Sequence, residues 1–197
     1  ELQKLLNLPQ KQDTPLIAVI TRMVAHKGMD LITSVLDELL EDDVQLVVLG
    51  TGDWQYEQFL RDKQWQYPSN LSVNIAFNAD LAQKIYAASD IFLMPSLSEP
   101  CGLAQMIALR YGSIPIVRET GGLRDTVTPY NKFTGEGRGF TFHDYNAHDM
   151  LYVIREAEET YADKEAWSAL SLAGMKIDFS WKKSAKEYKS LYEALII

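Results

Sequence analysis

Short apolar runs alternate with longer amphipathic segments over the first three quarters of the chain. The runs typical of strands are 16–20, 44–49, 71–77, 91–94, 114–117 and, more weakly, 139–142. Between them, residues 28–40, 53–66, 79–88 and 102–111 carry apolar side chains at spacings of three and four, as helices do. Continuous apolar strands separated by helices predict an α/β fold, with a parallel sheet covered on both faces.

The last quarter of the chain has a helical pattern. We predict helices over 147–161, 164–175 and 181–195, and a short helix end within 1–8, before Pro9. Glycines at 121–122 and 135–139 indicate loops at the sheet edge. Trp181, Tyr188, Leu191 and Tyr192 are predicted to form the packing face of the last helix. No linker interrupts the pattern, so residues 1–197 are expected to be one domain that ends in a helix over 180–197.

Composition and charge exclude some classes of function. The chain of 197 residues is 47% hydrophobic and has a formal net charge of −8. The negative charge argues against a nucleic-acid or anionic membrane partner, and no apolar stretch reaches the roughly 18 residues of a membrane span. A single cysteine is typical of a reducing compartment, so we predict a cytoplasmic protein. Because residue 1 is Glu rather than Met, we expect a piece of a longer protein.

Polar residues follow the first two predicted strands. Arg22 and Lys27 come after the first strand, and either bind a phosphate together or are solvated surface charges. Gly50, Thr51 and Gly52 come after the second strand. The glycines permit close backbone approach to a ligand, whereas Asp53 is also a candidate cap for the next helix. Carboxyl ends of parallel strands meet at one sheet edge, where α/β proteins bind ligands.

The later strand ends carry a second group of candidates. Glu99 follows the fourth strand and needs a partner or exposure, because a carboxylate is costly beside an apolar strand. Pro100 suits the first turn of a helix, which would place the amides of Cys101, Gly102, Leu103 and Ala104 at a helix start, where anions bind. Thr120, Gly121 and Gly122 follow the fifth strand. Phe77 either stacks on a base or packs in the core.

Other chemistries find little support. The histidines and carboxylates lack metal-ligand spacing, and no serine-nucleophile or P-loop motif occurs. Gln55 stands where the third glycine of a dinucleotide fingerprint belongs. No base adjoins Cys101 in sequence, which disfavours a nucleophilic role. We therefore expect neither a metal nor a cofactor.

Three strings of residues resemble one enzyme family. They are Glu-Pro-Cys-Gly-Leu-Ala-Gln at 99–105, Arg-Tyr-Gly at 110–112 and Thr-Gly-Gly-Leu at 120–123. Together they resemble the C-terminal domain of bacterial glycogen synthases and plant starch synthases. Thr21-Arg22 with Lys27-Gly28 is similar to a further motif of that family. Ile107 stands where broader retaining glycosyltransferases have a second Glu, which glycogen synthases also lack. Ala104 replaces a common Thr.

The resemblance implies a retaining hexosyltransferase that moves glucose from ADP-glucose to the non-reducing end of an α-1,4-glucan such as glycogen. It implies a single Rossmann-like domain, equivalent to the C-terminal half of a GT-B fold, whose partner is its own N-terminal domain. Arg22 and Lys27 would hold the diphosphate, Glu99 would contact the transferred glucose, and Phe77 would lie beside the adenine. Residues 101–104 and 120–123 would line the sugar and phosphates. The acceptor groove would belong to the N-terminal domain, so this chain alone is expected to be inactive.

Three alternatives stay open. The first is a retaining glycosyltransferase that uses a UDP- or GDP-sugar, whose phosphate site would look alike. The second is a nicotinamide-dependent dehydrogenase, which the broken glycine fingerprint disfavours. The third is a non-catalytic glucan-binding or interaction module. Affinities for ADP-, UDP- and GDP-glucose would test the first alternative. NADH binding with which ADP-glucose does not compete would favour the second, and glucan binding that ignores ADP-glucose would favour the third.

Overall fold

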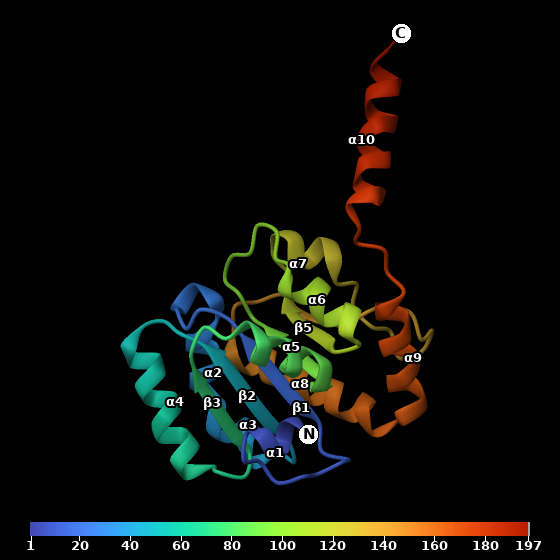
Figure 1. The fold of residues 1–197 in the computed structure, drawn as a ribbon. Coiled ribbons are helices and arrows are strands. Elements are labelled where there is room, and N and C mark those ends of the chain that lie inside the picture. The colour runs from blue at the N-terminus through green and yellow to red at the C-terminus, as the bar shows by residue number, and fades with distance from the viewer. Residues whose placement is uncertain (197) are drawn as a thin grey trace.

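The computed structural model describes residues 1–196 and contains a six-stranded sheet (Figure 1). The strand order is β3-β2-β1-β4-β5-β6, and all neighbouring strands are parallel. The strands are β1 (Leu16–Ile20), β2 (Gln45–Gly50), β3 (Leu71–Ile75), β4 (Ile91–Met94), β5 (Ile114–Arg118) and β6 (Phe140–Phe142). The predicted α/β class and parallel sheet are confirmed. In this order the chain reverses direction across the sheet between β1 and β4, the usual ligand position in such folds.

Helices cover both faces of the sheet (Figure 1). They are α1 (Leu2–Leu5), α2 (Met29–Ser34), α3 (Leu36–Glu41), α4 (Trp54–Gln66), α5 (Ala79–Ala88), α6 (Ala104–Tyr111), α7 (Gly121–Thr126), α8 (Ala147–Ala162), α9 (Lys164–Met175) and α10 (Trp181–Leu195), with a 3-10 turn η1 (Ala25–Lys27). Alternate strand residues point to opposite faces. Ile17 and Val19 pack with the α2, α3, α4 and α8 layer, whereas Ala18 and Phe92 pack with α1, α5 and α6.

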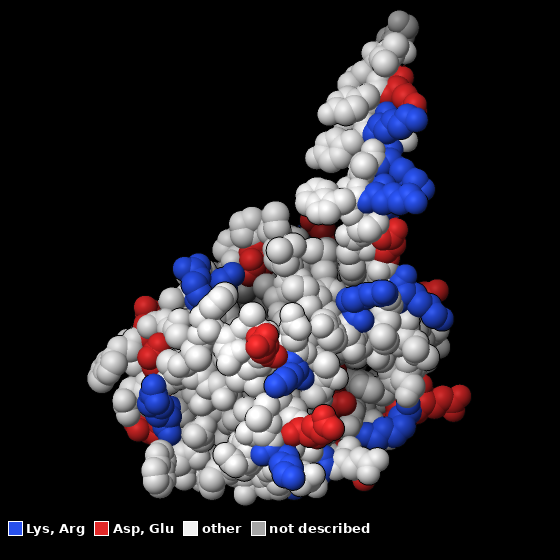
Figure 2. All heavy atoms as spheres, in the orientation of Figure 1, with Lys and Arg blue, Asp and Glu red and all other residues white. Residues whose placement is uncertain are grey.

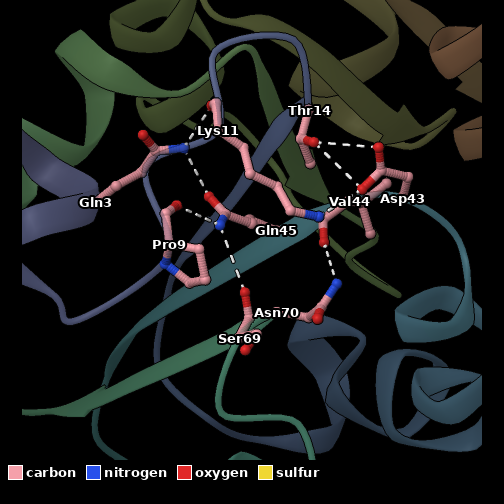
Figure 3. A network of polar contacts seen from close by, with 9 residues as sticks. All are labelled: Gln3, Pro9, Lys11, Thr14, Asp43, Val44, Gln45, Ser69 and Asn70. Atoms are coloured by element: carbon pink, nitrogen blue, oxygen red, sulfur yellow. Dashed lines mark hydrogen bonds and ion pairs between the residues drawn. The ribbon is translucent and has the colours of Figure 1, made fainter.

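A buried amide fixes the segment that precedes β1. Gln45 is fully buried at the start of β2, and its Nε2 donates to the Pro9 carbonyl at 2.9 Å (Figure 3). Its Oε1 accepts from Gln3 Nε2 at 2.8 Å. Nearby, Asn70 Nδ2 donates to the Val44 carbonyl. A buried amide needs such partners, so the network holds residues 3–9 at the edge opposite the strand ends that carry the predicted site.

Two elements differ from their predicted extents. The third strand ends at Ile75 rather than at Phe77, because its partner strand ends at Gly50, opposite Ile75. The predicted helix over 28–40 is divided into α2 and α3 at Val35. There the Thr33 and Ser34 hydroxyls donate to backbone carbonyls one turn back, a contact that competes with regular helix geometry.

Three further predictions are corrected. Helix α6 begins at Ala104 because Gly102 has φ +75°, so Pro100 lies in a turn before the helix rather than in its first turn. Residues 121–126, expected as loop, form α7, which buries Leu123. The aromatic stripe of α10 does not pack on this domain. Helix α10 projects away from the body (Figure 1), and no α10 residue is buried.

Candidate functional site

The residues after β1 and β4 meet where the chain reverses direction across the sheet. Lys27 Nζ lies 2.6 Å from Glu99 Oε2, and their side chains are only 18% and 11% exposed. The sequence predicted each residue at a strand end, and the structure brings the two into direct contact. A cation and a carboxylate are therefore held together at the position where α/β folds bind ligands.

The loop carrying Glu99 is tied to the turn carrying Lys27. The Leu97 N–H donates to the His26 carbonyl at 3.0 Å, and Ser96 Oγ donates to Glu99 Oε2 at 3.2 Å. Gly28 has φ +82°, and a Cβ there would overlap the carbonyl of Pro95. Only glycine permits both this backbone conformation and this approach. The ion pair is thus positioned by backbone contacts as well as by its own charges.

Arg118, at the end of β5, holds the loop that carries Glu99 through hydrogen bonds. Its guanidinium donates to the carbonyls of Ser96 (3.0 Å), Leu97 and His143 (3.2 Å). It also lies over the Tyr145 ring, 5.7 Å from the centroid, in a cation–π contact. Sequence reasoning did not single out Arg118. Its position at a strand end beside the predicted site is the signal that could have found it.

Tyr145 connects Arg118 to the turn that follows β1. Its hydroxyl donates to Asp30 Oδ1 and lies 3.1 Å from the Ala25 carbonyl. Burial and the hydrogen bond to the Asp30 carboxylate raise the pKa of Tyr145 above its ordinary value. The phenol therefore stays neutral and acts as a donor. Nothing in the sequence marked Tyr145, because its hydrogen-bond partners lie more than a hundred residues away.

A buried glutamine shapes the turn at 101–103. Gln105 is fully buried, and its Nε2 donates to the carbonyls of Cys101 (3.3 Å) and Gly102 (3.0 Å) and lies 3.0 Å from Thr126 Oγ1. In a trans peptide the N–H points away from the C=O. Holding these two carbonyls toward Gln105 directs the N–H groups of Gly102 and Leu103 the other way. These amides are thereby available for the anion contact predicted for residues 101–104.

The turn at 120–122 packs directly against the Glu99 loop. The Gly122 N–H donates to the carbonyls of Glu99 and Pro100, both at 3.1 Å. A Cβ at Gly121 would overlap the Glu99 carbonyl, and one at Gly122 would overlap the Cys101 carbonyl. These glycines are required by packing. The Gly122 N–H is already engaged, so a substrate contact by this residue cannot use that hydrogen.

The glycines at and just after the end of β2 also make packing contacts. A Cβ at Gly50 or Gly52 would overlap the carbonyls of Thr21 and Met23, which run beside them. The Gly52 N–H donates to Glu57 Oε1 at 2.8 Å. Asp53 occupies the N-cap position of α4, as predicted, but its side chain makes no capping hydrogen bond. The glycines let the extensions of β1 and β2 continue side by side.

A pocket adjoins the ends of β1, β2 and β3. It has a volume of about 260 Å³ and is lined by Arg22, Gly50, Thr51 and Phe77, among others. Phe77 is 96% exposed at this pocket, so it does not pack in the core. Arg22 is exposed and forms no ion pair with any residue in the range 1–196. An exposed ring and an unpaired cation thus lie together beside an apolar pocket.

Two further observations concern other chemistries. Within residues 1–196, no group of three or more His, Cys, Asp or Glu side chains is arranged to hold a metal ion. Over the same residues, no helix is both long and apolar enough to span a membrane.

The comparisons with known proteins bear on this arrangement. The sequence profile of the family described as "Glycosyl transferases group 1" matches residues 6–170. The chain belongs to this family. It is 58% identical over 197 residues to a glycogen synthase of Clostridium acetobutylicum and 56% identical over 195 residues to one of Geobacillus stearothermophilus. The two matches include 100% and 99% of this chain but only 41% and 40% of the length of the relatives.

Solved structures agree with the family assignment. The chain is similar to the catalytic domain of starch synthase IV from Arabidopsis thaliana, bound to ADP and acarbose, with 38% identity and a TM-score of 0.88. The match covers 98% of this chain and 41% of that one. Staphylococcus aureus TarM, at 17% identity and a TM-score of 0.72, shares the fold. The match to starch synthase IV confirms the predicted correspondence to the C-terminal, Rossmann-like half of a GT-B glycosyltransferase.

Proposed function

We propose that this chain is the nucleotide-sugar-binding part of a hexosyltransferase that transfers glucose from ADP-glucose to the non-reducing end of an α-1,4-glucan with retention. The observation that carries the proposal is the Lys27–Glu99 pair between the ends of β1 and β4. Arg22, in the pocket at the ends of the neighbouring strands and without an ion-pair partner among residues 1–196, supports it. The glycogen synthase relatives and the ADP-bound starch synthase support it. Because the chain spans about two fifths of those relatives, the activity belongs to the longer protein.

In the proposed reaction, the bond between glucose C1 and the diphosphate oxygen breaks, and an acceptor hydroxyl oxygen bonds to C1 on the same face. The hydroxyl proton passes to the leaving diphosphate. Negative charge develops on the leaving diphosphate. Arg22 and Lys27 stabilise that charge, aided by the N–H groups of Gly102 and Leu103. Glu99 accepts hydrogen bonds from glucose hydroxyls and faces the positive charge that develops on the sugar. The pocket beside Phe77 receives the base.

Arg22 provides a clean test of the diphosphate assignment. We expect Arg22→Ala to weaken ADP-glucose binding by about tenfold or more, because a charge-assisted hydrogen bond contributes about 1.5–3 kcal/mol. Since Arg22 has no ion-pair partner among residues 1–196, the substitution leaves no charge stranded. The measurement is calorimetric titration of the chain, with Arg61→Ala, another exposed arginine, as the matched control. Equal affinities of wild type and Arg22→Ala would remove Arg22 from the site.

The same titration distinguishes donors. We expect ADP-glucose to bind more tightly than UDP-glucose or GDP-glucose. Tighter binding of either of the latter would replace the donor assignment and leave the phosphate site intact. Binding of none of them, together with an interaction with glucan that ignores all three, would favour the non-catalytic module instead.

We further propose that the remainder of the longer protein covers helix α10. One side of α10 carries lysines, and the other carries uncharged side chains (Figure 2). The apolar side includes Trp181 (88% exposed), Tyr188, Leu191 and Tyr192. A contiguous exposed apolar face marks an interaction surface, and more than half of the relatives' length lies outside this chain. The predicted N-terminal domain is its proposed partner.

This contact is tested on the complete protein and on the present chain in parallel. Leu191→Ser should lower the thermal midpoint of the complete protein and leave that of the present chain unchanged. Lys189→Ser, on the charged side, is the matched control. If Leu191→Ser has no effect in the complete protein, another surface makes the contact.

A further inference from the structure

A hollow of about 600 Å³ lies apart from the site described above, where the ends of α1 and α4 meet the open edge of β3. It is lined by Asn7, Gln64, Trp65 and Asn74, together with apolar residues and the backbone of β3. None of its lining residues is Asp, Glu, Lys or Arg, although 23% of the chain is charged. A site without charge suits a neutral ligand and not a nucleotide or phosphate.

The edge of β3 presents a particular set of backbone groups. The Leu46 N–H donates to Asn70 O at 2.7 Å, and the Ala76 N–H donates to Gly50 O at 3.1 Å. Even-numbered residues of β3 therefore bond to β2, and the peptide groups of Leu71 and Val73 face the open edge. There, the Leu71 N–H already donates to Tyr67 O, and the Val73 N–H to Gln64 Oε1. The backbone groups of Leu71 and Val73 that stay free at this edge are therefore their carbonyl oxygens.

This set of groups discriminates between occupants. An added peptide strand needs both N–H donors and carbonyl acceptors along an edge, and beside the hollow the N–H donors of Leu71 and Val73 are engaged. A polyhydroxyl ligand supplies its own donors, which match the carbonyls of Leu71 and Val73. The Asn7 side-chain amide can bond hydroxyls in either direction. Asn74 Nδ2 already donates to Ser72 Oγ and to the Val48 carbonyl, so Asn74 adds its side-chain oxygen as an acceptor. The edge therefore favours a carbohydrate over a peptide.

Trp65 supplies the apolar part of such a site. It is 86% exposed at the end of α4 and lines the hollow. A flat indole beside hydrogen-bonding groups is an amphipathic surface, and a hexose ring has the same character, with C–H groups on its faces and hydroxyls at its rim. The ring can cover the indole while its hydroxyls reach the strand edge.

We propose that this hollow binds a short stretch of α-1,4-glucan, with one glucose ring on Trp65 and hydroxyls donated to the carbonyls of Leu71 and Val73. The choice of glucan among neutral polyols rests on the proposed function. A glucan held here stays on the same domain as the donor site, which raises the local concentration of acceptor ends. The site is a holding site, and no bond is made or broken in it.

Maltoheptaose binding by the present chain tests the proposal. Trp65→Ala should weaken binding by about tenfold, the contribution of one aromatic stacking contact, and Trp65→Phe should retain part of it. Trp54→Ala is the matched control, because Trp54 is 76% exposed on the same helix but does not line the hollow. Thermal unfolding of each variant checks that the fold is intact.

ADP-glucose is titrated in parallel, so that the two proposals fail separately. Loss of maltoheptaose binding in Trp65→Ala with unchanged ADP-glucose affinity is the expected result. ADP-glucose binding without any maltoheptaose binding overturns the holding site alone. Wild-type maltoheptaose affinity in Trp65→Ala also overturns it, because the glucan must then lie elsewhere. Maltoheptaose binding that depends on Trp65, without ADP-glucose binding, supports the site and overturns the proposed function.

Discussion

Replacing Arg118 tests whether its contacts at the end of β5 position the loop that carries Glu99. Arg118→Ala removes three charge-assisted hydrogen bonds to backbone carbonyls and the contact with Tyr145. Leu97 and His143 are exposed, so their carbonyls regain water. Ser96 is only 1% exposed, so its carbonyl is left without a donor. We therefore expect a loss of about 3 kcal/mol in the free energy of unfolding, most of it from Ser96.

The same substitution should weaken substrate binding without removing any group that contacts substrate. Ser96 bonds to Glu99, so a loosened loop no longer presents the carboxylate in one position. We expect about a tenfold loss of ADP-glucose affinity, with partial recovery in Arg118→Lys, which keeps the charge but not the fork of donors. Urea unfolding and calorimetric titration measure the two effects. Arg124→Ala, an exposed arginine on α7, is the control.

The reasoning is refuted if Arg118→Ala unfolds at the wild-type urea concentration. It is also refuted if the variant is destabilised but binds ADP-glucose as tightly as wild type. In that case Arg118 contributes only to the stability of the fold, and the loop that carries Glu99 keeps its geometry without the Arg118 contacts.

Two further predictions concern burial and packing. Burial, with Asp42 and Asp43 nearby, raises the pKa of Glu158 to about 7. A carboxyl with a raised folded-state pKa contributes stability at low pH that is lost as the pH rises through 7. Glu158→Gln should therefore stabilise the chain at pH 8 by about 1–2 kcal/mol, allowing for solvent screening, and much less at pH 5. Denaturant titrations at both pH values check this, and equal gains would contradict it. Gly122→Ala should cost about 2–3 kcal/mol and weaken ADP-glucose binding, because its Cβ overlaps the Cys101 carbonyl. Gly135→Ala is the comparison, because nothing lies near its Cβ and only its φ of +71° opposes an alanine, at a cost of about 1 kcal/mol. A Gly122→Ala variant no less stable than Gly135→Ala would exclude the overlap.

The sheet was predictable from the sequence because a strand buried on both faces is a continuous apolar run. Ile91–Met94 is such a strand, and it was predicted with its observed ends. The strand-end position of Lys27 and Glu99 followed from the same pattern. Their direct contact did not, because a distance across the sheet depends on which strands are neighbours. Arg118 and Tyr145 stayed hidden for the same reason.

Local sequence rules failed where tertiary contacts override them. Glycines at 121 and 122 indicated a loop, yet close packing on the Glu99 loop and burial of Leu123 form a helix there. The aromatic side of α10 was predicted to be a packing face, yet no residue of α10 is buried on this domain. An apolar pattern indicates that a face has a partner and does not say which part of the protein supplies it.

The most direct test of the central claim is calorimetric titration of ADP and of ADP-glucose into wild type, Lys27→Ala and Glu99→Gln. If Lys27 faces the diphosphate and Glu99 the glucose, Lys27→Ala weakens both ligands by about tenfold or more. Glu99→Gln then weakens ADP-glucose and leaves ADP no weaker than in wild type. Equal losses of ADP and ADP-glucose in Glu99→Gln, or unchanged ADP affinity in Lys27→Ala, would contradict the assignment of the site.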